Sequence, residues 1–106
     1  MAAIAFKIMK RYSIDPYVLD VLLPDLVGHD RRPAAFLVYL CLMCAAERAG
    51  TPSVALSLQD ISVRTGLAKS TVQAAIRHLR RRALISDEIA ATTTHPVRRL
   101  QKPWVR

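Results

Sequence analysis

The sequence contains little glycine and few aromatic residues, and both shortages exclude classes of function. Three glycines in 106 residues provide no glycine-rich loop of the kind that cradles phosphates in nucleotide-binding enzymes. The only tryptophan is Trp104, and a single aromatic side chain makes a poor base-stacking platform for nucleic acid. We therefore expect Trp104 to pack against the core.

Long hydrophobic runs are also missing. The longest apolar run, AAFLVYLCLMCAA at residues 34–46, falls short of the roughly 18 to 20 residues that span a bilayer. It therefore predicts a buried helix and no membrane association. The N-terminal MAAIAFKIMKRY places its apolar stretch before its basic residues and offers no cleavage site for a signal peptidase. We accordingly expect a cytoplasmic protein.

The two cysteines and three histidines do not form a pattern that binds metal. Cys41 and Cys44 form a CxxC, but His29, His78 and His95 supply no second pair at zinc-finger spacing. A thioredoxin-type pair would open a helix after a strand, whereas this pair lies inside an apolar run. We expect two structural thiols, no metal and no cofactor. No paired acids or nucleophile with its base stand out, so we expect no enzymatic activity.

The positive charge is concentrated in the second half of the chain. The formal net charge is +8. Residues 1–50 hold six Lys/Arg against five Asp/Glu, whereas residues 51–106 hold ten against three. This asymmetry predicts a polyanionic partner. Length and composition, with 52% hydrophobic and 23% charged residues, predict one globular domain.

Prolines and glycines mark the helices of the first half. The Asp15-Pro16 pair predicts an N-cap followed by proline at the first helical position, and Pro24 should end or kink that helix. A second, longer helix opens at residues 30–33 and is stopped by Gly50.

The second helix is apolar nearly all round between residues 34 and 46, so another surface must cover it. Two covers are open: the N-terminal segment together with Trp104, or a second copy of the chain. We expect a homodimer whose interface uses this helix or the segment before it.

In the second half, a short strand at residues 53–56 precedes a capping box formed by Ser57 and Asp60, which predicts a third helix from about Leu58. This helix ends near Gly66, which supplies the positive φ angle of a tight turn. A fourth helix follows, from about Lys69 to Arg82. Its apolar positions recur at amphipathic spacing: Val72, Ala75, Ile76 and Leu79.

Two strands are expected after the fourth helix. Residues 83–90 and 97–100 have strand-like patterns, and the segment between them, residues 92–96, contains a proline that suits a hairpin loop.

Two helices joined by a glycine turn, the second with one apolar and one basic face, fit the description of a helix-turn-helix. Residues 57–85 resemble the core of bacterial winged helix-turn-helix regulators and of plasmid and phage replication initiators, and residues 31–40 resemble their first helix. The resemblance departs at Ala68, where similar proteins often have an N-cap residue, so Ser70 caps the helix instead or the first turn frays. The residues that carry the resemblance are Ile61, Gly66, Leu67, Ser70, Thr71, Val72, Ile76, Leu79, Leu84 and Ile85.

The resemblance implies a mainly α fold, a winged helix-turn-helix with a three-helix core, an N-terminal helix and a short β-hairpin wing. Residues 1–29 would form an N-terminal extension and residues 30–106 the core, with the helix-turn-helix at 58–82 and the wing at 83–101. It implies sequence-specific binding of double-stranded DNA and regulation of transcription. The alternatives are a replication or partition initiator of a mobile element and a winged-helix module that contacts proteins.

The helix beginning at Lys69 would then read the DNA, and its helical wheel indicates how. With Val72 and Ile76 at the buried centre, the side chains of Ser70, Gln73, Ala74, Arg77 and Arg81 point away from the core. Arginine pairs with guanine and glutamine with adenine, while Ser70 and Thr71 suit phosphate oxygens at the helix N-terminus.

The wheel also separates two kinds of arginine. Arg77 lies about 140° from Val72 and should enter the groove, whereas Arg80 lies about 80° away, toward the flank. Arg80 and Arg82 would contact phosphates or stay solvated. The plain alternative is that residues 77–82 form only a solvated charged face.

In the wing, Thr93 would lie at the tip, and Arg98 or Arg99 would face phosphate. The complete set of predicted DNA-binding residues is Lys69, Ser70, Thr71, Gln73, Ala74, Arg77, Arg81, Thr93 and Arg98.

Overall fold

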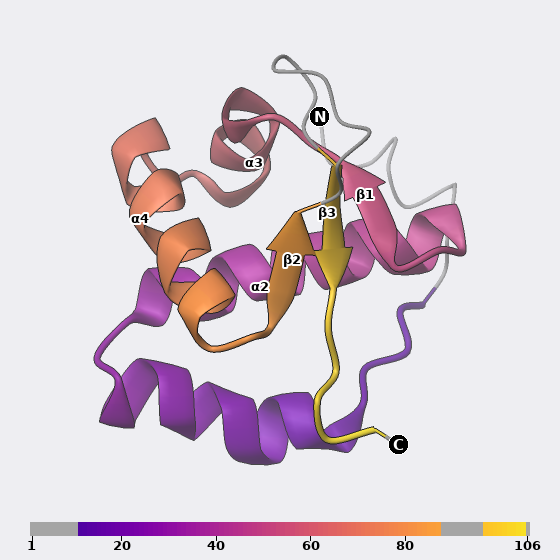
Figure 1. The fold of residues 1–106 in the computed structure, drawn as a ribbon, viewed down its shortest axis with the longest axis vertical. Coiled ribbons are helices and arrows are strands. Elements are labelled where there is room, and N and C mark those ends of the chain that lie inside the picture. Colours follow the sequence, from indigo (N-terminus) through magenta and orange to yellow (C-terminus); the bar gives the residue numbers. More distant parts are fainter. Residues whose placement is uncertain (1–10, 88–96, 106) are drawn as a thin grey trace.

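The chain folds into a mainly helical structure with one small antiparallel sheet (Figure 1). The computed structural model describes residues 11–87 and 97–105. The predicted order of helix, helix, short strand, helix, helix and two strands is confirmed. The elements are the π-helical segments η1 (Val18–Leu22) and η2 (Asp25–His29), then α2 (Pro33–Ala49), β1 (Ser53–Ala55), α3 (Leu58–Thr65), α4 (Lys69–Arg81), β2 (Ile85–Asp87) and β3 (Val97–Leu100).

The N-terminal helix begins where the sequence predicts but does not end at Pro24. The backbone N–H of Tyr17 donates to Oδ1 of Asp15 at 3.0 Å, which fixes the start. Pro24 has helical angles, φ −65° and ψ −29°, and the chain continues through η2 to His29. The proline ring already holds φ near this value, so it fits between the two segments.

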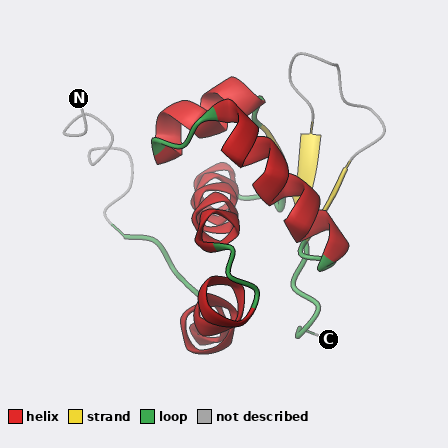
Figure 2. Cartoon of the chain, turned by 90° about the vertical axis from the view of Figure 1, so that its left-hand side faces the viewer, coloured by secondary structure: helices red, strands yellow, loops and turns green. Residues whose placement is uncertain are grey.

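Helix α2 lies at the centre of the molecule, with the N-terminal helix on one side and α3, α4 and the sheet on the other (Figures 1 and 2). Tyr39 is fully buried, and its hydroxyl donates to the carbonyl oxygen of Gln101 at 3.1 Å. Neighbours within one chain therefore cover most of this apolar helix. The buried residues of α2 are Ala35, Phe36, Val38, Tyr39, Leu42 and Met43.

The prediction that Trp104 packs against the core is confirmed. Its ring stacks on Tyr17 with centroids 4.4 Å apart, and its Nε1 donates to Oδ2 of Asp15 at 3.2 Å. The indole packs against the core cluster. The C-terminal segment thereby holds the start of the N-terminal helix in place.

Helix α2 also contains both cysteines. Cys41 and Cys44 are half-buried free thiols, and burial raises the pKa of each. A raised pKa keeps a thiol protonated and weakens it as a nucleophile or metal ligand.

Over residues 11–87 and 97–105, no helix combines the length and apolarity needed to cross a membrane.

The sheet has the strand order β1-β3-β2, with both pairings antiparallel. The predicted pairing of the last two strands is confirmed, with Ile85 opposite Leu100. Strand β1 pairs with the other side of β3, with Val54 opposite Arg98. The predicted start of the first of these strands is wrong, because residues 83 and 84 lie in the turn before β2, and the predicted strand residues 88–90 lie outside the described residues.

Local signals fix how α3 and α4 follow one another. The Ser57 Oγ accepts from the backbone N–H of Asp60 at 3.1 Å, and Oδ2 of Asp60 accepts from the N–H of Ser57 at 3.0 Å. This confirms the capping box. Gly66 has the predicted left-handed conformation, φ +79°. Ala68 stands at the N-cap of α4 and provides no side-chain cap.

Candidate nucleic-acid interface

Helix α4 divides into an apolar face that anchors it and a polar face that meets solvent. Its inner side chains are at most 3% exposed and pack toward α2 and α3: Val72, Ala75, Ile76 and Leu79. The helix contains no acidic residue. Its exposed residues are Lys69, Ser70, Gln73, Arg77, Arg80 and Arg81. The outer face is therefore uniformly basic and polar.

The structure brings most of the predicted residues onto this one face. Lys69, Ser70, Gln73, Arg77 and Arg81 are exposed along the outer side of α4. The remaining two of α4, Thr71 and Ala74, are half-buried at its edges. Thr93 lies outside the described residues.

The prediction that Arg98 faces phosphate is wrong, because its side chain is buried. It is 6% exposed, and its guanidinium donates to the carbonyl oxygen of Leu56. The reason is strand alternation, because Leu100 is in the core and a residue two positions away points to the same side of β3. Arg99, between them, is exposed.

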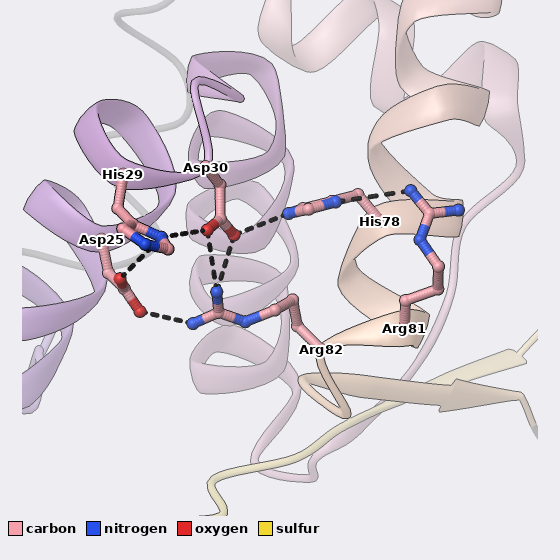
Figure 3. A network of polar contacts seen from close by, with 6 residues as sticks. All are labelled: Asp25, His29, Asp30, His78, Arg81 and Arg82. Atoms are coloured by element: carbon pink, nitrogen blue, oxygen red, sulfur yellow. Dashed lines mark hydrogen bonds and ion pairs between the residues drawn. The ribbon is translucent and has the colours of Figure 1, made fainter.

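A second correction concerns Arg82, which was expected to contact phosphate or stay solvated: it is only partly exposed, and its guanidinium binds two carboxylates (Figure 3). Its Nη1 donates to both oxygens of Asp30, at 2.9 and 2.7 Å. Its Nη2 donates to Oδ2 of Asp25. Both acids come from the end of the N-terminal helix, so Arg82 joins the end of α4 to η2.

His78 strengthens the same connection from one turn earlier in α4. Its Nε2 donates to Oδ2 of Asp30 at 2.7 Å. On the opposite side, Nη2 of Arg81 lies 3.4 Å from Nδ1 of His78. We call the group of Asp25, Asp30, His78 and Arg82 the interhelix clamp. It holds the C-terminal end of α4 against the N-terminal helix.

The charges of the clamp stabilise one another. The pKa of Asp30 is lowered, first by the hydrogen bond from His29 and then by His78 and Arg82, against an opposing effect of burial. The pKa of Arg82 is raised, mainly by its hydrogen bond to Asp25. The side chain of Asp30 is only 6% exposed, so its charge depends on these partners rather than on water.

Within the described ranges, one group of three side chains has the spacing of metal ligands. The ligand atoms of Asp25, His29 and Asp30 lie within 4.8 Å of one another. Both carboxylates, however, already bind the guanidinium of Arg82. The arginine supplies the positive charge that a cation would bring, and we assign the group a structural role.

We expect Asp30→Asn to remove part of the acid sensitivity of the fold. A carboxyl group whose pKa is lower in the folded state stabilises the fold above its unfolded pKa of 3.8, and this contribution is lost as the pH falls through the folded pKa. The difference in unfolding free energy between the native chain and the variant should therefore shrink as the pH falls below about 5. Urea unfolding at a series of pH values measures it, and a difference that stays constant with pH would contradict this role for Asp30.

Comparison of the chain with protein-family models, with curated proteins and with solved structures finds no significant match. The main features of the site are an acid-free, basic outer face on α4, a polar start of that helix, and a clamp that fixes its far end.

Proposed function

We propose that this protein binds double-stranded DNA as a winged helix-turn-helix, with α4 in the major groove, and that it regulates transcription. The observation that carries the proposal is the outer face of α4, which exposes basic and polar side chains without an acid among them. A polyanion is the partner that such a face attracts.

The arrangement around α4 supports a groove-binding role. Helix α3 and α4 are joined by a short turn through left-handed Gly66, and the strands β2 and β3 follow α4 directly. A helix about 10 to 12 Å across fits the roughly 12 Å width of the major groove. Strands β2 and β3 pair antiparallel, and these two strands would form the wing.

The start of α4 suits a phosphate group. Ala68 contributes no side-chain cap, so the first backbone N–H groups of the helix are available to an anion, and Ser70 is exposed beside them. The departure from the usual N-cap residue at Ala68 thereby gains a physical meaning, because a DNA phosphate would take the place of the cap.

The base-reading residues would be those nearest the middle of the outer face. Gln73 and Arg77 are both exposed there, and their side chains have the donors and acceptors that pair with adenine and guanine. Arg80 stands at the flank, where it borders a surface hollow with Ser86 and Lys102. Arg80 would therefore contact the phosphate backbone of the DNA and not the bases.

Binding to duplex DNA should weaken steeply with salt. Each phosphate neutralised by the protein changes the slope of log K against log salt by about −0.9, so four or five contacts predict a slope near −4. Fluorescence anisotropy with a random duplex pool measures this slope, and selection from the same pool gives the preferred site. The matching single strand serves as the control and should bind less tightly.

A flat salt plot, or no binding to any duplex, would contradict the proposal. The outer face of α4 would then belong to a protein-contacting module. The description of the clamp and of the fold does not depend on DNA binding and would still hold.

A further inference from the structure

The N-terminal helix carries a partly exposed apolar stripe on the flank next to the side that packs against α2. Leu19, Leu23 and Val27 are 48%, 36% and 37% exposed. They recur every four residues, the spacing that places side chains on one helix face. In Figures 1 and 2 this helix forms the lower edge of the molecule, and no other described helix or strand lies beyond it. The next stripe of the same helix is buried in the core: Val18, Leu22 and Leu26.

We propose that the stripe of Leu19, Leu23 and Val27 is the contact between two copies of this chain, packed antiparallel about a two-fold axis at Leu23. A two-fold interface must be complementary to itself. Around this axis Leu23 meets its own counterpart, and Leu19 of each copy meets Val27 of the other. Even spacing along the helix makes the stripe match itself in this orientation.

The charges at the two ends of the helix favour the same arrangement. Asp20 is exposed toward the N-terminal end, and Arg31 and Arg32 are exposed just beyond the C-terminal end. Antiparallel packing brings the acidic end of each copy toward the basic end of the other. Parallel packing would instead place the arginines of both copies together, which is unfavourable.

The location also agrees with how α2 is covered. The sequence placed a dimer contact on residues 34–46 or on the segment before them. Within residues 34–46 only Leu37 is exposed, so the preceding segment offers the larger apolar surface for the contact. The interhelix clamp ties this segment to the end of α4. If the proposed DNA binding holds, the dimer would fix the distance between two reading helices and select a palindromic site.

The interface is tested without DNA, so its failure is distinct from failure of the DNA-binding proposal. Sedimentation equilibrium should find a reversible dimer with twice the 11.8 kDa mass of the chain. Leu23→Glu places two like charges at the axis and should raise the dimer dissociation constant by more than about 100-fold. Val63→Glu, at an apolar residue of α3 that is 72% exposed, should leave it unchanged. A monomer at submillimolar concentration, or a dimer that survives Leu23→Glu, overturns the proposal.

Cross-linking tests the axis directly and applies even if Leu23→Glu does not fold. In a background with Cys41→Ala and Cys44→Ala, the variant Leu23→Cys should form a disulfide with its own copy when oxidised glutathione accepts the two electrons. Leu19→Cys alone should not cross-link, but a mixture with Val27→Cys should. Equal cross-linking of Leu23→Cys and Val63→Cys overturns the two-fold axis.

Discussion

Replacing Arg82 by methionine should lower the free energy of unfolding by about 2 to 3 kcal/mol. Removing one partner of a fully buried ion pair costs about 3 to 5 kcal/mol, because it leaves the other charge without compensation. Asp30 is 6% exposed, but Arg82 is 32% exposed, so water makes up part of the loss. For a domain of this size the change lowers Tm by roughly 10 to 20 °C.

Arg81→Met is the matched control. Arg81 is the preceding residue of the same helix, is exposed, and has one 3.4 Å contact with His78. Its replacement should change the unfolding free energy by less than about 0.5 kcal/mol. Thermal and urea unfolding of both variants measure the difference, and equal losses would show that the clamp does not hold α4.

A double-mutant cycle locates the effect of Arg82→Met in the clamp. Asp30→Asn should cost less in the Arg82→Met background than in the native chain, because the buried carboxylate has then already lost its guanidinium partner and keeps only the two histidines. Strictly additive losses would mean that Arg82 acts through some other contact.

Replacing Arg77 by alanine should weaken binding to the selected duplex by about 5- to 150-fold, which corresponds to roughly 1 to 3 kcal/mol for a bidentate contact with guanine. The same change should relax the preference at one base pair. Arg77 is exposed on the outer face of α4 and away from the buried contacts of the helix, so the fold should be unaffected. Competition between the selected and a scrambled duplex at fixed salt measures both effects.

Arg80→Ala provides the comparison within the same helix. Arg80 borders the hollow next to Ser86 and Lys102, so it should contact phosphate, and its loss should weaken the selected and the scrambled duplex about equally. If Arg77→Ala also weakens binding to the selected and the scrambled duplex equally, Arg77 contacts phosphate. The proposal that this part of α4 contacts bases is then wrong.

The sequence by itself determined the start of α3, the turn that follows it and the buried face of α4. Ser57 and Asp60 bond to each other three residues apart, and Gly66 adopts the left-handed angle that few other residues tolerate. The inner face of α4 follows from the spacing of Val72 and Ile76. These features depend on residues within one or two helical turns, so a single sequence contains all the information they need.

In the N-terminal half and in the sheet, some local signals are compatible with more than one structure. Pro24 is compatible with a helix as well as with its end. The inward direction of Arg98 follows from alternation with Leu100, once the strand is known to be the central one. That β1 completes the sheet beside β3 requires a contact between residues about 45 positions apart, which no local pattern specifies.

Only the tertiary structure decided the different roles of neighbouring arginines. On the helical wheel Arg80 and Arg82 lie on opposite flanks of α4, each about 80° from Val72, and local sequence treats them alike. The fold places η2 beside one flank, where Asp25 and Asp30 bind Arg82, and leaves Arg80 exposed on the other. Local sequence sets the direction of a side chain from its helix, but its partner depends on which distant segment the packing of α2 brings alongside.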